Sequence, residues 1–303
     1  MLISELADAF LTANQNSYLA NTRRAYGYDL GLFTRAFPEL PVEEITVQHL
    51  RAFLTATAVL APSTLARRQA TLRSCFGWAF RNDLVGADPT GKLEPIKVPQ
   101  RDPRPLTEAQ VEAILAAVPT AEKRNRLFFT LLYETGMRVG EALGLQVQQV
   151  NLNEVDGGYL RVIGKGDKER IVPLIDAPRT VRLLREVLKK VGTVGPLFRG
   201  DASKGGHAGE ALDYTTMYYH FERYVAAVQE KHAGSFQGEA EPITIHRFRH
   251  TFATLRLKDG VSLPSVRKLL GHKNLQTTLR YAETDLDTIK KELSEARRRR
   301  NRR

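Results

Sequence analysis

A proline-rich stretch, Lys92–Pro105 (KLEPIKVPQRDPRP), constrains this chain more than any other feature, because no regular pattern runs through it. It carries four prolines and several charges but no periodic apolar positions. Proline fixes its own backbone and disfavours helix at the preceding residue, so the stretch is predicted to be an extended linker. A chain of 303 residues also fits two domains better than one. We therefore predict one domain over residues 1–100 and a second over 101–303.

The first 100 residues have the spacing of amphipathic helices. Apolar side chains such as Leu6 and Phe10 recur three or four positions apart, which favours helix over strand. A compact set of helices is therefore predicted. Residues able to cap the second, third and fourth helices are Asn21 or Thr22, Thr46 and Ser63.

The predicted fourth helix combines an apolar stripe with a high density of arginine. Its apolar positions are Leu65, Leu72, Phe76 and Phe80, and its basic positions are Arg67, Arg68, Arg73 and Arg81. Such a density suits contacts with phosphates. For any one of these arginines, a solvated charged face is an equally good interpretation.

The second domain begins with a helix-start signal, and an arginine that is expected to be partly buried follows the second helix. Thr107 followed by Gln110 is a capping-box pattern, and a later helix is predicted to stop near Gly136. Arg138 follows that stop between Met and Val, so it is expected to be partly buried and to need an anionic partner. Glu141 is one candidate partner, and a phosphate held by Arg138 is the other.

A single hairpin is predicted at residues 159–174, YLRVIGKGDKERIVPL. Its apolar strand positions flank a turn of Gly, Lys, Gly and Asp, which places Lys165 at the tip. A turn lysine most often serves solubility alone. Alternatively, it delivers an ammonium group that donates a proton or holds a phosphate.

The stretch Ile245–Tyr281 gathers an unusual set of side chains. It contains His246, Arg249, His272 and Tyr281. Histidine moves protons near neutral pH, arginine grips phosphate through a planar fork, and a deprotonated tyrosine is a nucleophile. Together these groups suit phosphoryl transfer without a metal. A zinc-ligand pair and a surface coincidence are the competing interpretations, but a zinc-protease motif requires glutamate where Arg247 stands.

Composition limits the classes of protein that remain. A formal net charge of +11 and an isoelectric point near 9.8 favour a polyanionic partner, with nucleic acid first. A hydrophobic content of 42% is enough for buried cores. The single cysteine, Cys75, excludes an internal disulfide framework and fits a reducing cytoplasm. The N-terminus does not have the pattern of a signal peptide, and no apolar run reaches the roughly 18 residues of a membrane span, so no membrane partner is expected.

Five motifs, taken in order, resemble those of the tyrosine recombinases, the family of phage integrases and Xer-like site-specific recombinases. They are TGMRVGEALGL, GKGDKER, HRFRHTFAT, LLGH and TLRYAE. The segments NTRRAYGYDLGLF and Ser63–Trp78 resemble parts of the family's helical core-binding domain. Phe248 stands where the HxLRH pattern has leucine. The basic C-terminal run, KKELSEARRRRNRR, matches no element of the family.

The resemblance implies a role for each matching residue. Tyr281 would attack a DNA phosphodiester and leave a 3′-phosphotyrosyl link. Arg138 and Arg249 would clamp the non-bridging oxygens, and Lys165 would protonate the departing 5′ oxygen. His246 would handle the tyrosine proton. His272 would add a hydrogen bond to the phosphate, and neither metal, ATP nor another cofactor would be needed.

The expected fold is mainly α, with an N-terminal helical, SAM-like core-binding domain and a mostly helical α+β catalytic domain that holds a small antiparallel sheet. The catalytic domain would end in a basic tail. The expected partners are double-stranded DNA and three further copies of the chain, forming a homotetramer on two DNA sites, with or without a partner recombinase. A type IB topoisomerase and a non-catalytic DNA-binding regulator are the alternative functions. The short chain with its Xer-like motifs argues against the first, and the complete set of six catalytic side chains argues against the second.

Overall fold

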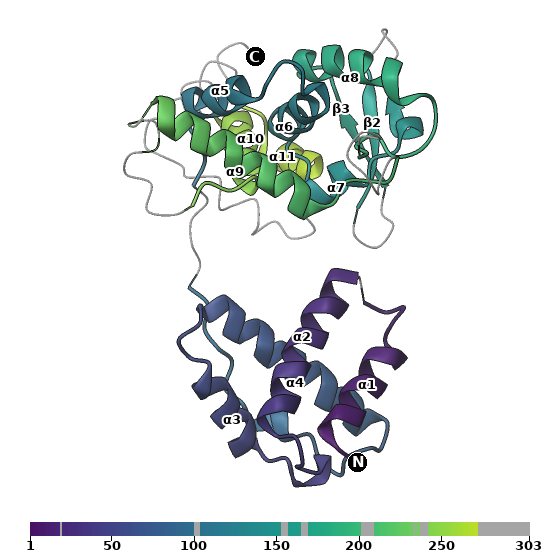
Figure 1. Ribbon diagram of the computed structural model, residues 1–303, viewed down its shortest axis with the longest axis vertical. Coiled ribbons are helices and arrows are strands. Elements are labelled where there is room, and N and C mark those ends of the chain that lie inside the picture. The colour runs from purple at the N-terminus through teal and green to yellow at the C-terminus, as the bar shows by residue number, and fades with distance from the viewer. Residues whose placement is uncertain are drawn as a thin grey trace, which may run out of the picture. The chain divides into compact units, whose positions relative to one another are not determined.

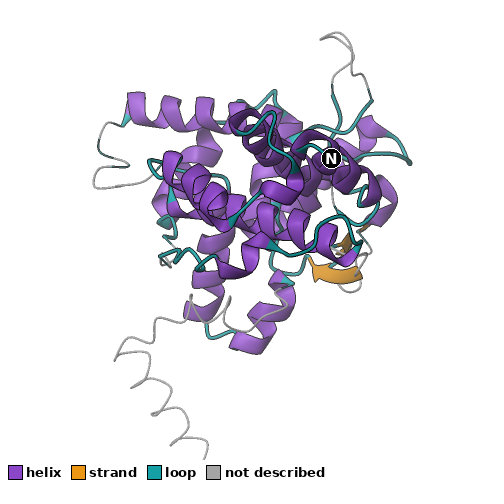
Figure 2. Ribbon diagram, turned by 90° about the horizontal axis from the view of Figure 1, so that it is seen from below, coloured by secondary structure: helices purple, strands orange, loops and turns teal. Residues whose placement is uncertain are grey.

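The computed structural model describes residues 1–18, 20–99, 104–152, 157–164, 169–200, 209–232, 234, 236 and 242–271. The chain divides into two compact units, Met1–Arg101 and Asp102–Arg303 (Figure 1). Helices dominate both units, and one small sheet lies in the second (Figure 2). The mainly helical fold class predicted from the sequence is confirmed.

In the described residues of the N-terminal unit there are four helices and two short 3-10 turns. The elements are α1 (Ile3–Ala13), α2 (Ala20–Ala36), η1 (Val42–Glu44), α3 (Val47–Ala56), α4 (Pro62–Arg81) and η2 (Pro89–Lys92). Thr46 occupies the N-cap position of α3, as predicted. The other two cap predictions are wrong. Helix α2 already includes Asn21, and α4 starts at Pro62, whose fixed φ suits the first helical position.

The core of this unit is aromatic. Phe33 packs edge to face with Phe53, at 5.1 Å between ring centroids, and with Phe76, at 6.1 Å. All three rings are buried, which fixes α2, α3 and α4 around one another. Phe80 was predicted to lie on the same apolar side of α4, but this residue, on the last turn of the helix, is 48% exposed.

Two arginines of α4 are bound to a buried carboxylate and do not form a solvated basic face. Arg67 donates a hydrogen bond to Asp29 of α2, and Arg68 lies 3.6 Å from the same carboxylate. Asp29 is 1% exposed. Burial raises the pKa of Asp29, while Arg67, Thr71 and Arg68 act in the opposite direction. Of the four arginines, Arg67 and Arg68 are therefore held by internal pairing, which the helical pattern alone did not indicate.

The start of the proline-rich stretch is attached to the N-terminal unit. Leu93 is buried, and its carbonyl accepts a hydrogen bond from Arg73. Gln69 of α4 donates to the Glu94 carbonyl at 2.7 Å and accepts from the Ile96 N–H at 3.2 Å. The regular pairing of this extended segment with α4 therefore continues to Ile96.

The larger unit contains the remaining elements. They are α5 (Glu108–Ala117), α6 (Lys123–Thr135), α7 (Val139–Leu143), η3 (Val147–Gln149), β1 (Val150–Asn151), β2 (Tyr159–Ile163), β3 (Glu169–Pro173), α8 (Pro178–Val191), α9 (Tyr214–Lys231), α10 (His246–Lys258) and α11 (Leu263–Leu270).

Helix α6 forms the centre of this unit. It packs against α8 on one side and α10 on another, and α5 packs against α9. Its residues Leu127, Phe128 and Phe129 are fully buried. A helix surrounded in this way needs apolar residues on most of its circumference, which the sequence LFFTLLY supplies.

Capping residues and glycines mark several ends of these helices. Thr107 and Gln110 make the reciprocal capping-box hydrogen bonds at 2.9 and 3.2 Å. Gly136 ends α6 with a left-handed φ of 64°, and Gly271 ends α11 with a φ of 65°. Ser262 caps α11 through its hydroxyl. The capping box at Thr107 and the stop at Gly136 were predicted, because side-chain caps and glycine stops are local signals.

The sheet is antiparallel in the order β1–β2–β3. The hairpin of β2 and β3 was predicted. Its register, which was not predicted, puts Leu160 opposite Val172 and Val162 opposite Arg170. The two-residue strand β1 was not predicted, because so short a strand leaves no alternating pattern. Among the described residues, no helix is both long enough and apolar enough to cross a lipid bilayer.

Candidate functional site

Three of the six predicted site residues are described, and all three belong to the larger unit. Arg138 precedes α7, while His246 and Arg249 lie on the first turn of α10. Lys165, His272 and Tyr281 lie outside the described residues. The described part of the predicted site therefore consists of Arg138, Arg249, His246 and the side chains that hold them.

Arg249 is held deep in the fold. It is 2% exposed, and its Nη1 donates to the Gly136 carbonyl at 2.6 Å. Its Nη2 donates to the Leu270 carbonyl at 2.7 Å. The two carbonyls belong to the left-handed stop of α6 and to the last turn of α11, both of which leave acceptors without helical partners. Arg249 thus connects the ends of two helices to α10.

Arg138 reaches the same place from α7. It occupies the N-cap position of that helix, and its side chain is 41% exposed. Its Nη2 donates to the Gly271 carbonyl at 3.2 Å, and its Nη1 donates to Glu141 at 2.7 Å. The ion pair with Glu141, which the sequence offered as one alternative, is therefore present. The guanidinium still has an exposed side.

Glu141 is a buried carboxylate whose two oxygens are fully used. It accepts hydrogen bonds from the Arg138 side chain and from the Arg138 backbone N–H, the latter at 2.9 Å. It also accepts two from Arg170 of β3, at 2.9 and 2.8 Å. Burial alone would raise the pKa of Glu141, but the hydrogen bonds from Arg170 and Arg138 outweigh it and lower the pKa to about 2. Glu141 is therefore a permanent anion near neutral pH.

Arg170 completes a cluster of charged side chains with Arg138, Glu141 and Arg249. It was not identified as a site residue from the sequence. Its Nε donates to the Leu269 carbonyl at 3.2 Å. The pleat of a strand puts alternate residues on one face, so Arg170 shares its face with buried Val172. An arginine at an inward-facing strand position was the signal that could have identified it.

The end of α11 is consequently held by three arginines. Consecutive carbonyls of Leu269, Leu270 and Gly271 accept from Arg170, Arg249 and Arg138 in that order. These carbonyls are the negative end of the helix dipole, which suits cationic donors. Helix α11 leads directly into His272 in the sequence.

His246 lies near the two candidate clamp residues. Its ring packs edge to face against His250, with 4.7 Å between centroids. Partial desolvation, followed by repulsion from Arg249 and Arg138, lowers the pKa of His246 from its ordinary 6.5. The imidazole is therefore neutral at pH 7 and able to accept a proton.

The cluster has an excess of positive charge. Arg138, Arg170 and Arg249 carry three positive charges, and Glu141 carries the one negative charge that pairs with them. Such a site attracts a phosphate or another oxyanion. Within the described part of the chain, no group of three or more His, Cys, Asp and Glu side chains could hold a metal ion.

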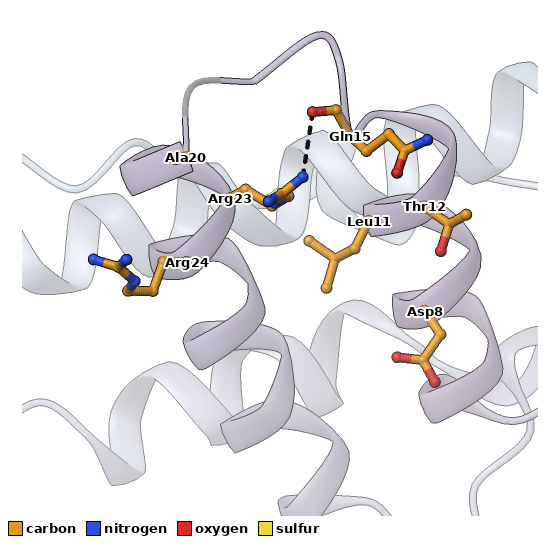
Figure 3. Close-up of a pocket in the computed structure, with 7 residues that line it drawn as sticks. All are labelled: Asp8, Leu11, Thr12, Gln15, Ala20, Arg23 and Arg24. Carbon is orange, nitrogen blue, oxygen red and sulfur yellow. Dashed lines mark hydrogen bonds between the residues drawn. The ribbon is translucent and has the colours of Figure 1, made fainter. Parts of the chain in front are cut away.

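A separate hollow lies in the N-terminal unit between α1 and α2 (Figure 3). Two arginines of α2 line it, and one of them, Arg23, donates to the Gln15 carbonyl at 3.5 Å. The lining residues are Asp8, Leu11, Thr12, Gln15, Ala20, Arg23 and Arg24. The hollow contains none of the side chains predicted to act in catalysis.

Both units match models of known protein families. Residues 104–287 match the phage integrase family, and residues 10–83 match the phage integrase N-terminal SAM-like domain. The first match alone covers more than half of the chain. It includes the positions of all six predicted site residues.

Curated relatives cover most of the chain. The tyrosine recombinase XerD of Proteus mirabilis is 33% identical over 282 residues, which is 89% of this chain and 85% of the relative. The tyrosine recombinase XerC of Thermodesulfovibrio yellowstonii is 31% identical over 279 residues, 88% of this chain and 87% of the relative.

Solved structures share the fold. The XerH site-specific recombinase in a pre-cleavage complex has a TM-score of 0.67 at 24% identity, covering 96% of this chain and 83% of that one. A lambda integrase has a TM-score of 0.71 at 20% identity, covering 93% of this chain and 77% of that one. With the family match and the curated relatives, the conclusion is that this chain belongs to the phage integrase family and is a tyrosine site-specific recombinase.

Proposed function

We propose that this recombinase cuts and rejoins DNA strands through a covalent link between Tyr281 and the 3′ phosphate. The observation that carries the proposal is the convergence of Arg138 and Arg249 on the end of α11, immediately before His272. Two guanidinium groups from different helices are held there at fixed positions. In this proposal, the two groups act as a clamp that binds two non-bridging oxygens of one phosphodiester.

The reaction consists of two balanced transfers. The phenolic oxygen of Tyr281 attacks the phosphorus, a bond between that oxygen and phosphorus forms, and the bond to the 5′ oxygen breaks. The 5′ oxygen leaves as a hydroxyl group with a proton from Lys165. Attack by a 5′ hydroxyl in the reverse direction rejoins a strand and releases the tyrosine, so the energy of the phosphodiester is conserved without ATP.

The electrostatics support a metal-free activation of the nucleophile. A free tyrosine has a pKa of about 10, so it needs a base and a positive field near neutral pH. In this proposal, the arginine cluster supplies the field, and neutral His246 receives the proton. In the transition state, the clamp stabilises charge that grows on the oxygens around phosphorus.

Duplex DNA is the proposed partner, with four protomers assembled on two sites. The net charge of +11 favours a polyanion. The related solved recombinases are described as bound to DNA, namely XerH to a difH substrate and lambda integrase as a tetramer to a Holliday junction. Recombination between two sites requires strands from two duplexes, which a tetramer can hold together.

The test is covalent capture in the presence of EDTA. The probe is a pool of duplexes with a randomised core, each nicked so that the released fragment diffuses away and religation fails. Adducts are resolved on a denaturing gel, and the captured DNA is sequenced to define the substrate and the cleaved phosphate. Tyr281→Phe is expected to abolish the adduct and to retain DNA binding, because only the attacking oxygen is removed.

Tyr219→Phe is the matched control, since Tyr219 is an exposed tyrosine of α9, with its side chain 66% exposed, and lies outside the cluster. It is expected to form adduct at the wild-type level. An adduct retained by Tyr281→Phe would show that another residue is the nucleophile. DNA binding without any wild-type adduct would favour a non-catalytic binding protein.

A further inference from the structure

We propose that Arg170 is a positioning residue for strand cleavage, acting on the Arg138 clamp through Glu141 and the end of α11. This inference rests on the proposed function. Arg170 does not belong to the six residues assigned from the motifs. Its role is inferred from its contacts, its burial and the balance of charge around it.

The contacts of Arg170 join three separate elements. The residue lies on β3, and its side chain is 14% exposed. Its two terminal nitrogens donate hydrogen bonds to the two oxygens of Glu141 on α7, at 2.9 and 2.8 Å. Its Nε donates to the Leu269 carbonyl of α11 at 3.2 Å. One guanidinium thereby fixes the hairpin, α7 and α11 relative to one another.

Glu141 transmits this constraint to Arg138. A carboxylate held on both oxygens by Arg170 cannot rotate, so the Arg138 guanidinium that it binds at 2.7 Å is fixed as well. Loss of Arg170 would leave Glu141 held only by Arg138, through its backbone N–H and its side chain. The clamp would then sample orientations that do not match the scissile phosphate.

Arg170 also sets the net charge of the group that it forms with Arg138 and Glu141. Arg138 and Glu141 alone form a neutral pair, which attracts an anion only weakly. Arg170 adds the second cation, so the group of three carries one net positive charge. The negative charge of Glu141 is thus balanced from the protein side, and the charge of Arg138 remains available to the phosphate.

The packing at Gly271 shows how closely Arg170 approaches the end of α11. A Cβ atom added at Gly271 would lie 3.2 Å from Cδ, Nε and Cζ of Arg170. Lysine at position 170 would keep the charge, but its donors lie on one nitrogen, which cannot reproduce the planar contacts of arginine with both Glu141 oxygens and the Leu269 carbonyl. The site therefore uses the geometry of arginine in addition to its charge.

The experiment measures the single-turnover rate constant of adduct formation on the captured substrate, at saturating enzyme, for Arg170→Gln and Arg170→Lys. Arg170→Gln is expected to lower it roughly 10²-fold, because the clamp loses both charge and orientation. Arg170→Lys is expected to lower the rate constant by roughly 10-fold or more, since its charge does not replace the planar set of donors of a guanidinium. Reaction amplitude and melting temperature are recorded to separate loss of folded protein from loss of rate.

Arg223→Gln is the matched control. Arg223 of α9 is also ion-paired, at 2.6 Å from Glu122, but it does not contact the cluster. Its loss is expected to leave the rate constant unchanged, even if the melting temperature falls. A purely structural role of Arg170 would give this same result.

A modified substrate separates positioning of the clamp from other effects. When a methyl group replaces one non-bridging oxygen of the scissile phosphate, the negative charge that the arginines hold is removed. On this substrate, the fold-reduction in rate constant caused by Arg170→Gln is expected to be at least roughly 10-fold smaller than on the normal phosphodiester. Equal losses on both substrates, or a wild-type rate constant for both Arg170 variants, would overturn the inference. Absence of a Tyr281-dependent adduct in the wild type would instead overturn the proposed function.

Discussion

At the scale of single residues, His246 shows how the cationic cluster tunes its neighbours. Desolvation and the charges of Arg249 and Arg138 all disfavour the imidazolium ion. The folded protein therefore keeps His246 neutral at pH values where an ordinary histidine begins to protonate. A proton acceptor for a tyrosine needs that property, because protonated histidine cannot accept.

The pH dependence of cleavage follows from this shift. At enzyme concentrations where little DNA is bound, the second-order rate constant of adduct formation reports the pKa values of the free enzyme. The rate is expected to be constant near neutral pH and to fall in acid as His246 protonates, with a midpoint below 6.5 because its pKa is lowered. In His246→Gln, the acid limb is expected to disappear and the plateau to be lower. A midpoint above 6.5 would contradict the lowered pKa.

Contacts between side chains could be predicted from the sequence only where the two residues lie close together along the chain. Glu141 was named as a partner of Arg138 because the two lie three residues apart across a helix start, where spacing determines contact. The buried pair of Asp29 with Arg67 and Arg68 joins residues about forty positions apart, and no local spacing indicates it. Arg170 bridges Glu141 and Leu269 in the same non-local way.

At the scale of elements, the cluster depends on where helices end. Helix α6 stops at Gly136, and α11 stops at Gly271, and both stops release carbonyls that arginines then bind. Glycine stops and capping residues are visible in a sequence, so these ends could be predicted. Strand β1 and the start of α2 could not, since the first is too short for a pattern and the predicted caps of the second, Asn21 or Thr22, lie inside the helix.

Gly136→Ala tests the importance of the α6 stop. Alanine strains the φ of 64°, and its methyl group would meet the Phe252 ring and lie 2.9 Å from Leu270 Cδ2. The free energy of unfolding, measured by urea denaturation, is expected to fall by about 2–5 kcal/mol. Gly140→Ala within α7 has open space around the new methyl group and is expected to change it by less than about 1 kcal/mol. Equal stabilities of the two variants would contradict this account.

At the scale of the whole molecule, each unit has its own hydrophobic core. One cluster runs from Ile3 to Leu93, entirely within the N-terminal unit. The clusters of the larger unit start at Leu106 and include the packing of Phe252 on α10 against Leu270 on α11. The proline-rich stretch, which was predicted to be a linker, lies between these clusters in the sequence, although its Leu93 belongs to the N-terminal core. How each core is packed was not predictable, since it depends on contacts distant in sequence.

Cleavage of the linker tests whether both units act on one DNA molecule. A protease recognition sequence is inserted between Pro99 and Arg104, and binding of the captured duplex is measured by fluorescence anisotropy before and after proteolysis. If both units contact DNA, the intact linker makes the second contact intramolecular, and cutting it is expected to weaken binding by roughly 10²-fold or more. The uncut insertion variant controls for the inserted sequence. Unchanged affinity after complete cleavage would mean that one unit alone carries the binding, and the idea of two units gripping one duplex would then be wrong.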